Sequence, residues 1–157
     1  MEGYPTLEPG DAARAFITWA ESEWPLSEAN AQALVTRLGW IPLPASPGAF
    51  SFPMNPGAFN GYFLTLDGNV SSFSLVLADV PDEVGEERAG TMTSEYLAEL
   101  VAALEARWGR GEHSSGVASF GAHGSYEWTL PSGATVSVDY SARRVVADLE
   151  SPQFLET

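Results

Sequence analysis

The stretch GYFLTLDGNVSSFSLVLA, residues 61–78, decides the fold. In its first half Tyr62, Leu64 and Leu66 alternate with Phe63 and Thr65, and the dipeptide Asp67-Gly68 that follows favours a tight two-residue turn. After the turn, one face of the returning segment carries Phe73, Leu75 and Leu77. Alternation with a period of two is typical of a strand with one buried face. The stretch therefore predicts an antiparallel hairpin.

The same period recurs in the last third of the chain. Tyr126, Trp128 and Leu130 alternate with polar residues, and Pro131-Ser132-Gly133 supplies a turn into the alternating segment 135–140. Shorter strands are expected at 50–52, 117–120 and 145–149. Consecutive strands joined by tight turns pair antiparallel, so all of these segments are expected to form an antiparallel sheet.

Three helices are predicted from apolar residues spaced three and four apart. Asp11 is the expected N-cap of the first, and Pro25 ends it near Trp24. Ser27 is the expected N-cap of the second, and Gly39 its left-handed C-cap, with Trp40 packing behind it. The three predicted helices span residues 11–24, 27–38 and 93–108.

The predicted elements follow the order α-α-β-β-β-α-β-β-β-β, which is typical of an α+β fold. We expect an antiparallel sheet of about six to seven strands with the three helices packed on one face. The strand residues expected to meet the helices are Tyr62, Leu64, Phe73, Leu75, Trp128, Val136 and Val138.

An internal α-β-β-β duplication is a second prediction. Ser27-Glu28 and Ser94-Glu95 open two helices, and the segments 62–66 and 126–130 both read Tyr-x-x-Thr-Leu. Chance similarity between hairpins would give the same letters, and the spacings between them do not keep one period. Both interpretations stay open from the sequence.

Length and composition limit the classes of protein. A chain of 157 residues predicts one globular domain over residues 1–157, with residues 1–10 as a loose N-terminal arm. The absence of Cys excludes disulfide scaffolds and thiol nucleophiles, and the seven basic residues are all Arg. Frequent Ala, Gly and Pro indicate a coding sequence rich in G and C, which is typical of high-GC bacteria.

The net charge of −14 argues against partners that are themselves anionic. Nucleic acids and anionic membranes are bound by basic patches, so we expect neither as a partner. The first residues lack the basic and apolar regions of a signal peptide, and no run of about 20 apolar residues would span a bilayer. We therefore expect a cytoplasmic protein.

No catalytic, cofactor-binding or metal-binding set is evident in the sequence. His113 and His123 stand in Gly/Ser-rich segments expected to be loops, and neither belongs to a ligand motif. Glu127 and Asp139 are the best carboxylate pair, because strand alternation turns both away from the core and adjacent strands would bring them close. Acids on the wet face of a sheet are also ordinary, so we expect no enzyme activity.

A protein partner is the expected ligand. The segment 79–88 is acidic without apolar periodicity, which indicates a loop free to contact a basic partner or to act only as a solvated linker. Trp24, between Glu23 and Pro25, is the tryptophan expected to be exposed. The predicted partner-binding residues are Asp79, Asp82, Glu83, Glu86, Glu87 and Trp24.

In its acidic balance, its helix 34–40 leading into a Tyr-rich hairpin, and its loop 79–88, the chain resembles small immunity-type proteins of bacterial polymorphic toxin systems. That resemblance is of general character and carries no site residue. It implies a non-catalytic protein-binding domain that inhibits a basic toxin. Two alternatives stay open: a small-ligand-binding domain or weak hydrolase using Glu127 and Asp139, and a secretion-chaperone-like protein.

Overall fold

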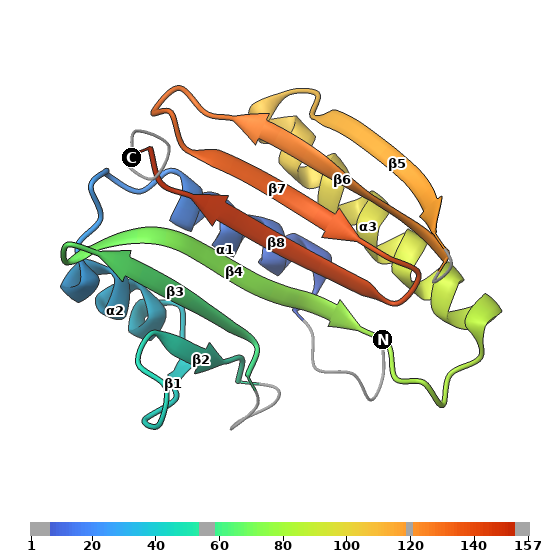
Figure 1. Ribbon diagram of the computed structural model, residues 1–157, viewed down its shortest axis with the longest axis horizontal. Coiled ribbons are helices and arrows are strands. Elements are labelled where there is room, and N and C mark those ends of the chain that lie inside the picture. Colours follow the sequence, from blue (N-terminus) through green and yellow to red (C-terminus); the bar gives the residue numbers. More distant parts are fainter. Residues whose placement is uncertain (1–6, 54–58, 119–120, 153–157) are drawn as a thin grey trace.

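The computed structural model describes residues 7–53, 59–118 and 121–152, and in these it contains three helices and eight strands (Figure 1). The elements are α1 (Pro9–Ala20), α2 (Glu28–Arg37), β1 (Ile41–Pro42), β2 (Ala49–Ser51), β3 (Gly61–Leu66), β4 (Asn69–Asp79), α3 (Glu86–Trp108), β5 (Glu112–Ala118), β6 (Gly121–Thr129), β7 (Thr135–Tyr140) and β8 (Arg144–Glu150). This confirms the predicted α+β class and element order, with eight strands instead of six to seven.

All eight strands form one antiparallel sheet in the order β1-β2-β3-β4-β8-β7-β6-β5. The additional strand is β1, a two-residue edge segment of Ile41 and Pro42. It lies in a segment where Pro and Gly predict only turns, and Pro is tolerated in a strand at a sheet edge.

The strand order is symmetric about the pairing of β4 with β8. Each half contains a helix followed by four neighbouring strands, α2 before β1–β4 and α3 before β5–β8, and the first half carries α1 in addition. A helix followed by four strands in each half is the arrangement expected of two related units. However, the two Tyr-x-x-Thr-Leu segments fall on β3 and β6, the third strand of one half and the second of the other. Those letters are not in equivalent places, so the internal duplication stays a prediction.

The ends of α2 follow the sequence prediction. The Ser27 side chain accepts a hydrogen bond from the backbone N–H of Asn30 at 3.1 Å. Gly39 has a φ of 80°, and the N–H of the buried Trp40 donates to the Val35 carbonyl at 3.0 Å. A left-handed glycine with this pair of contacts ends a helix by satisfying its last carbonyls.

The other two helices begin earlier than predicted. Helix α1 starts at Pro9 and ends at Ala20, so the expected N-cap at Asp11 and the expected end at Trp24 are wrong. Proline suits the first helical position, where its fixed φ fits and no N–H is needed. Helix α3 starts at Glu86, well before Thr93, because acids are favourable in a first helical turn and Ala89 extends the buried stripe.

The helices lie on one face of the sheet, as predicted (Figure 1). On that face Trp19 of α1 stacks on Phe73 of β4 with ring centroids 4.1 Å apart. Phe63 pairs with Phe73 across the hairpin and is buried, whereas Leu64 is 54% exposed. The expectation that Tyr62 and Leu64 face the helices is therefore wrong. The other five predicted core residues are buried: Phe73, Leu75, Trp128, Val136 and Val138.

Within the described residues, no helix combines the length and apolarity needed to cross a membrane. Leu7 packs against the core, and its carbonyl accepts a hydrogen bond from the Tyr96 hydroxyl at 2.7 Å. Of the loose arm predicted for residues 1–10, Leu7 therefore packs against the core, and Pro9 and Gly10 belong to α1. Residues 1–6 of the predicted arm lie outside the described residues.

Candidate functional site

The sheet face opposite the helices, which we call the open face, carries the side chains that alternate with the buried ones. A row of cross-strand partners runs over it from Tyr62 on β3 through Ser74, Asp148 and Ser137 to Glu127 on β6. Neighbouring strands are about 4.8 Å apart, so this row extends about 19 Å. The register therefore fixes which polar groups share the face.

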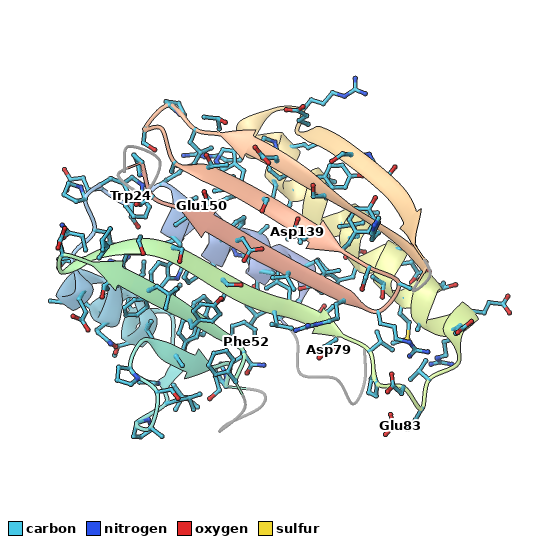
Figure 2. The ribbon with its side chains drawn as sticks, viewed as in Figure 1. Trp24, Phe52, Asp79, Glu83, Asp139 and Glu150 are labelled. Carbon is cyan, nitrogen blue, oxygen red and sulfur yellow. The ribbon has the colours of Figure 1, made fainter. Side chains whose placement is uncertain are left out.

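Two further rows flank this one. The first consists of Leu64, Ser72, Glu150 and Thr135, and the second of Val76, Val146, Asp139 and Ser125. Four acids consequently gather on β6, β7 and β8, and we call them the acidic quartet: Glu127, Asp139, Asp148 and Glu150. Figure 2 labels Asp139 and Glu150 on this face.

Asp139 is the member of the quartet whose protonation is most perturbed. Partial burial raises the pKa of its carboxyl to about 6, and the hydrogen bond and negative charge of Asp148 act in the same direction. Glu127 adds a smaller repulsion, while the Ser137 hydroxyl, which donates to Asp139 across 3.4 Å, lowers the pKa. Asp139 therefore holds its proton up to a higher pH than an isolated aspartic acid would.

The predicted pair of Glu127 and Asp139 is only partly borne out by this geometry. Both lie on the open face, and their strands are neighbours. Glu127 lies opposite Ser137, however, and the carboxyl that hydrogen-bonds Asp139 is that of Asp148. Sequence reasoning missed Asp148, although its alternation with Val145, Ala147 and Leu149 already placed it on the polar side of its strand.

A hollow of 590 Å³ opens beside Asp139. Its walls include Ser114, His123, Ser125, Tyr140 and Arg144. They offer hydroxyl and charged groups to a polar ligand, but among the described residues no group of three or more His, Cys, Asp or Glu is placed to hold a metal ion.

Both histidines lie on strands, so their expected loop positions are wrong. His123 is on β6, and His113 is on β5, stacked on Tyr126 at a centroid distance of 4.1 Å. The His113 Nε2 also lies 2.8 Å from the Tyr140 hydroxyl. The Gly and Ser residues that suggested loops instead allow close strand pairing, since a Cβ on Gly124 would lie 2.5 Å from the Ser114 carbonyl oxygen.

The predicted acidic loop 79–88 is not one loop. Asp79 ends β4, where its carboxylate lies 3.8 Å from Arg144, while Glu86 and Glu87 belong to the first turn of α3. The connection between them is fastened by Arg143, whose guanidinium donates to the Pro81 and Val84 carbonyls at 2.7 and 2.8 Å.

We call the four exposed acids of this region the acidic turn: Asp82, Glu83, Glu86 and Glu87. In Figure 2 the labelled Glu83 lies beyond the end of β4, away from Glu150. The acidic turn and the acidic quartet are therefore separate surfaces.

Trp24 is not free at the surface. Its side chain is half-buried against the core, and the indole N–H donates to the Ala20 carbonyl at 3.4 Å. The tryptophan therefore closes the end of α1, and only its exposed part is accessible to a partner.

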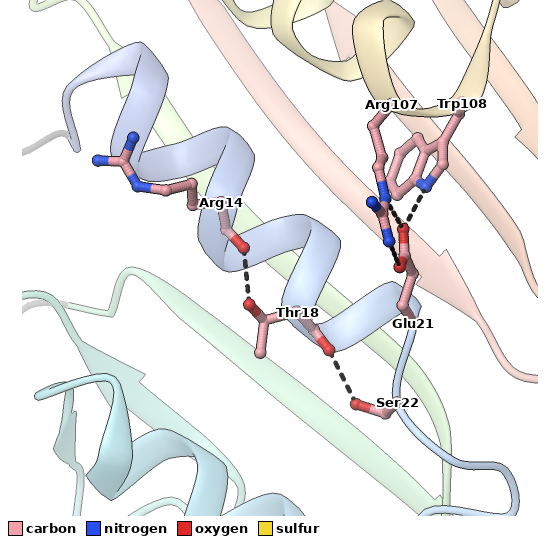
Figure 3. A network of polar contacts seen from close by, with 6 residues as sticks. All are labelled: Arg14, Thr18, Glu21, Ser22, Arg107 and Trp108. Carbon is pink, nitrogen blue, oxygen red and sulfur yellow. Dashed lines mark hydrogen bonds and ion pairs between the residues drawn. The ribbon is translucent and has the colours of Figure 1, made fainter.

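A polar network that the sequence did not predict joins the ends of α1 and α3 (Figure 3). Glu21 accepts hydrogen bonds from the Arg107 guanidinium, at 2.7 Å from Nε, and from the Trp108 indole at 3.0 Å. The hydrogen bond from Arg107 is the main cause that holds the Glu21 pKa below its usual value. Glu21 and Arg107 neutralise each other's charge in these contacts, so we assign the network a structural role that links α1 to α3.

The sequence matches the model of a family of unknown function, DUF6301, over residues 10–151. The chain belongs to this family. The match covers every element of the fold except the start of α1, and so includes the open face, the acidic turn and the Glu21 network. No curated protein and no solved structure matches the chain. The family match does not concern immunity proteins, so that resemblance remains a prediction.

Proposed function

We propose that the chain is a non-catalytic domain that binds a protein partner with a basic surface. The observation that carries the proposal is the excess of uncompensated carboxylates. In the described part of the chain, ion pairs join arginines to Asp11, Glu21 and Asp79, and none involves the acidic quartet or the acidic turn. With a net charge of −14, such a surface attracts a cationic partner and speeds its association.

Inhibition of a basic toxin is the form of this function that we favour. Small acidic immunity-type proteins, which the chain resembles, act by this kind of association. An inhibitor needs no reactive group of its own, only a surface that covers a functional surface of its target.

A pull-down from the native host with the tagged chain, followed by mass spectrometry and binding kinetics, tests the proposal. The partner is expected to be basic, and its association rate to fall several-fold between about 0.01 and 0.15 M salt, where the screening length drops from about 30 to 8 Å. An acidic partner, or an association rate independent of salt, would contradict it. For a toxin, expression of the partner alone should slow growth, and co-expression of this chain should restore it.

A second candidate is a weak hydrolase in the hollow beside Asp139. A carboxylic acid such as Asp139, whose pKa is raised to about 6, can donate a proton to a leaving group, and the neighbouring carboxyl group of Glu127 is the candidate base that would activate water. Assays with model glycosides and esters test this candidate. Hydrolysis that disappears in Asp139→Asn would support it, and equal rates in both proteins would exclude it. The secretion-chaperone alternative stays a prediction from the sequence.

A further inference from the structure

The open face has an apolar side next to its acidic side. Phe59 and Leu64 are 56% and 54% exposed, and the rings of Phe59 and Tyr62 are 5.6 Å apart between centroids. Tyr62 and Leu64 both point away from the helices, because the alternate residue Phe63 is the buried one. Large exposed apolar side chains gathered in one place are a common mark of an interaction surface.

A narrow polar strip separates the two sides. Ser72 and Ser74 of β4 lie between the residues of β3 and those of β8 in the two rows. Their side chains are small, so a partner can approach the sheet closely. Tyr62 and Asp148 are two strands apart, a separation of about 10 Å, which equals the diameter of an α-helix.

We infer that the open face is the surface that binds the basic partner, and that it receives an amphipathic basic helix of that protein. The inference rests on the proposed function and names its surface. Apolar side chains of the helix would pack on Tyr62 and Leu64, and its lysines or arginines would pair with the acidic quartet. Interfaces of this kind combine an apolar centre with complementary charges around it.

The acidic turn fits such a helix less well. It carries as many acids as the quartet, but the valines beside it in the sequence, Val80 and Val84, are buried and half-buried. The turn therefore attracts cations without offering apolar contact. This difference allows the two surfaces to be compared directly.

The probe is a synthetic peptide of about 14 residues with lysines on one helical face and leucines on the other, long enough to form a helix on binding. Two matched double variants each remove one Asp and one Glu: Asp148→Asn with Glu150→Gln on the open face, and Asp82→Asn with Glu83→Gln on the turn. Leu64→Ala is paired with Ile41→Ala, because Ile41 is also exposed, at 39%, but lies at the β1 edge. Far-UV circular dichroism and urea unfolding check that all four variants fold.

We expect amide shifts on peptide addition to centre on β3, β4 and β8. The open-face double variant should weaken peptide binding about fivefold, a modest loss because each exposed ion pair contributes little alone. The turn variant should weaken binding less than about twofold, because the peptide is expected to bind away from the turn. Leu64→Ala should weaken it about threefold through lost apolar contact, with Ile41→Ala unchanged.

The inference would be overturned by equal loss of peptide binding in both double variants, by amide shifts centred on residues 82–87, or by a dimer of the free chain that Leu64→Ala dissociates. The last would mean that a second copy covers the face. Absence of any peptide binding would also overturn it. In each case salt-dependent binding of a basic host partner would leave the proposed function standing.

Discussion

Replacing Asp139 by Asn removes the group whose ionisation the open face opposes most. The folded chain holds the Asp139 proton with a pKa of about 6, against an ordinary value of 3.8. Because the folded state binds this proton more tightly than the unfolded state, the wild type loses stability as the pH rises from about 4 to 6. Asn cannot ionise, so the Asp139→Asn variant does not lose this stability as the pH rises.

The magnitude follows from the same comparison. A pKa difference between 3.8 and about 6 corresponds to about 3 kcal/mol, and water around the half-buried carboxyl reduces this to about 1 kcal/mol. Asp139→Asn should therefore be more stable than the wild type by about 1 kcal/mol at neutral pH, and the advantage should vanish below about pH 4.

Urea unfolding of both proteins between about pH 4 and 7.5 measures this difference. Asp82→Asn is the matched control, because Asp82 is exposed in the acidic turn, away from the quartet, and should change stability by less than about 0.5 kcal/mol. A variant less stable than the wild type at neutral pH would refute the reasoning. A gain that stays the same at pH 4 would do so too, since a pH-independent gain cannot come from ionisation.

The remaining predictions concern the core, the turns and the surface charge. Leu100→Ala should cost about 2–5 kcal/mol in urea unfolding and half-buried Leu97→Ala clearly less; a loss below about 1 kcal/mol at Leu100 would mean that α3 is not packed on the sheet. Gly48→Ala should destabilise the chain more than Gly68→Ala, because both have positive φ but an added Cβ at Gly48 would lie 2.5 Å from the Phe63 carbonyl oxygen; equal melting temperatures would contradict this. Raising salt from about 0.01 to 0.15 M should raise the melting temperature near neutral pH by screening repulsion among carboxylates, and an unchanged value would show that the charges are too dispersed to matter.

The sequence contains enough information for the fold class because its signals are local. The Asp67-Gly68 turn, the Ser27 cap and the Gly39 C-cap each satisfy backbone groups within a few residues, and all three are found where predicted. Which face of a strand is buried depends, in contrast, on contacts with residues far away in the sequence. Tyr62 and Phe63 are both large and apolar, and only the pairing of Phe63 with Phe73 under Trp19 decides which one is buried.

The same limit explains what was missed around the site. In the sequence, residues 79–88 look like one acidic loop. Glu86 and Glu87 stabilise a helix only when they stand in its first turn, so their role becomes clear only once α3 is known to begin at Glu86. Asp148 and Asp139 come together only through the register of β7 with β8. The alternation along each strand predicts that both acids point away from the core, but it does not predict which side chain on the next strand lies beside each of them.

The central claim is that the open face binds a basic protein, and cross-saturation NMR on the complex with the basic host partner tests it most directly. In the methyl-labelled chain, Leu64, Val76 and Val146 report on the open face, and Val84 and Leu97 report on the acidic turn and on α3. We predict that saturation of the partner's protons reduces the signals of Leu64, Val76 and Val146 most strongly. Strongest reduction at Val84 or Leu97, with those three methyl groups unaffected, would contradict the account.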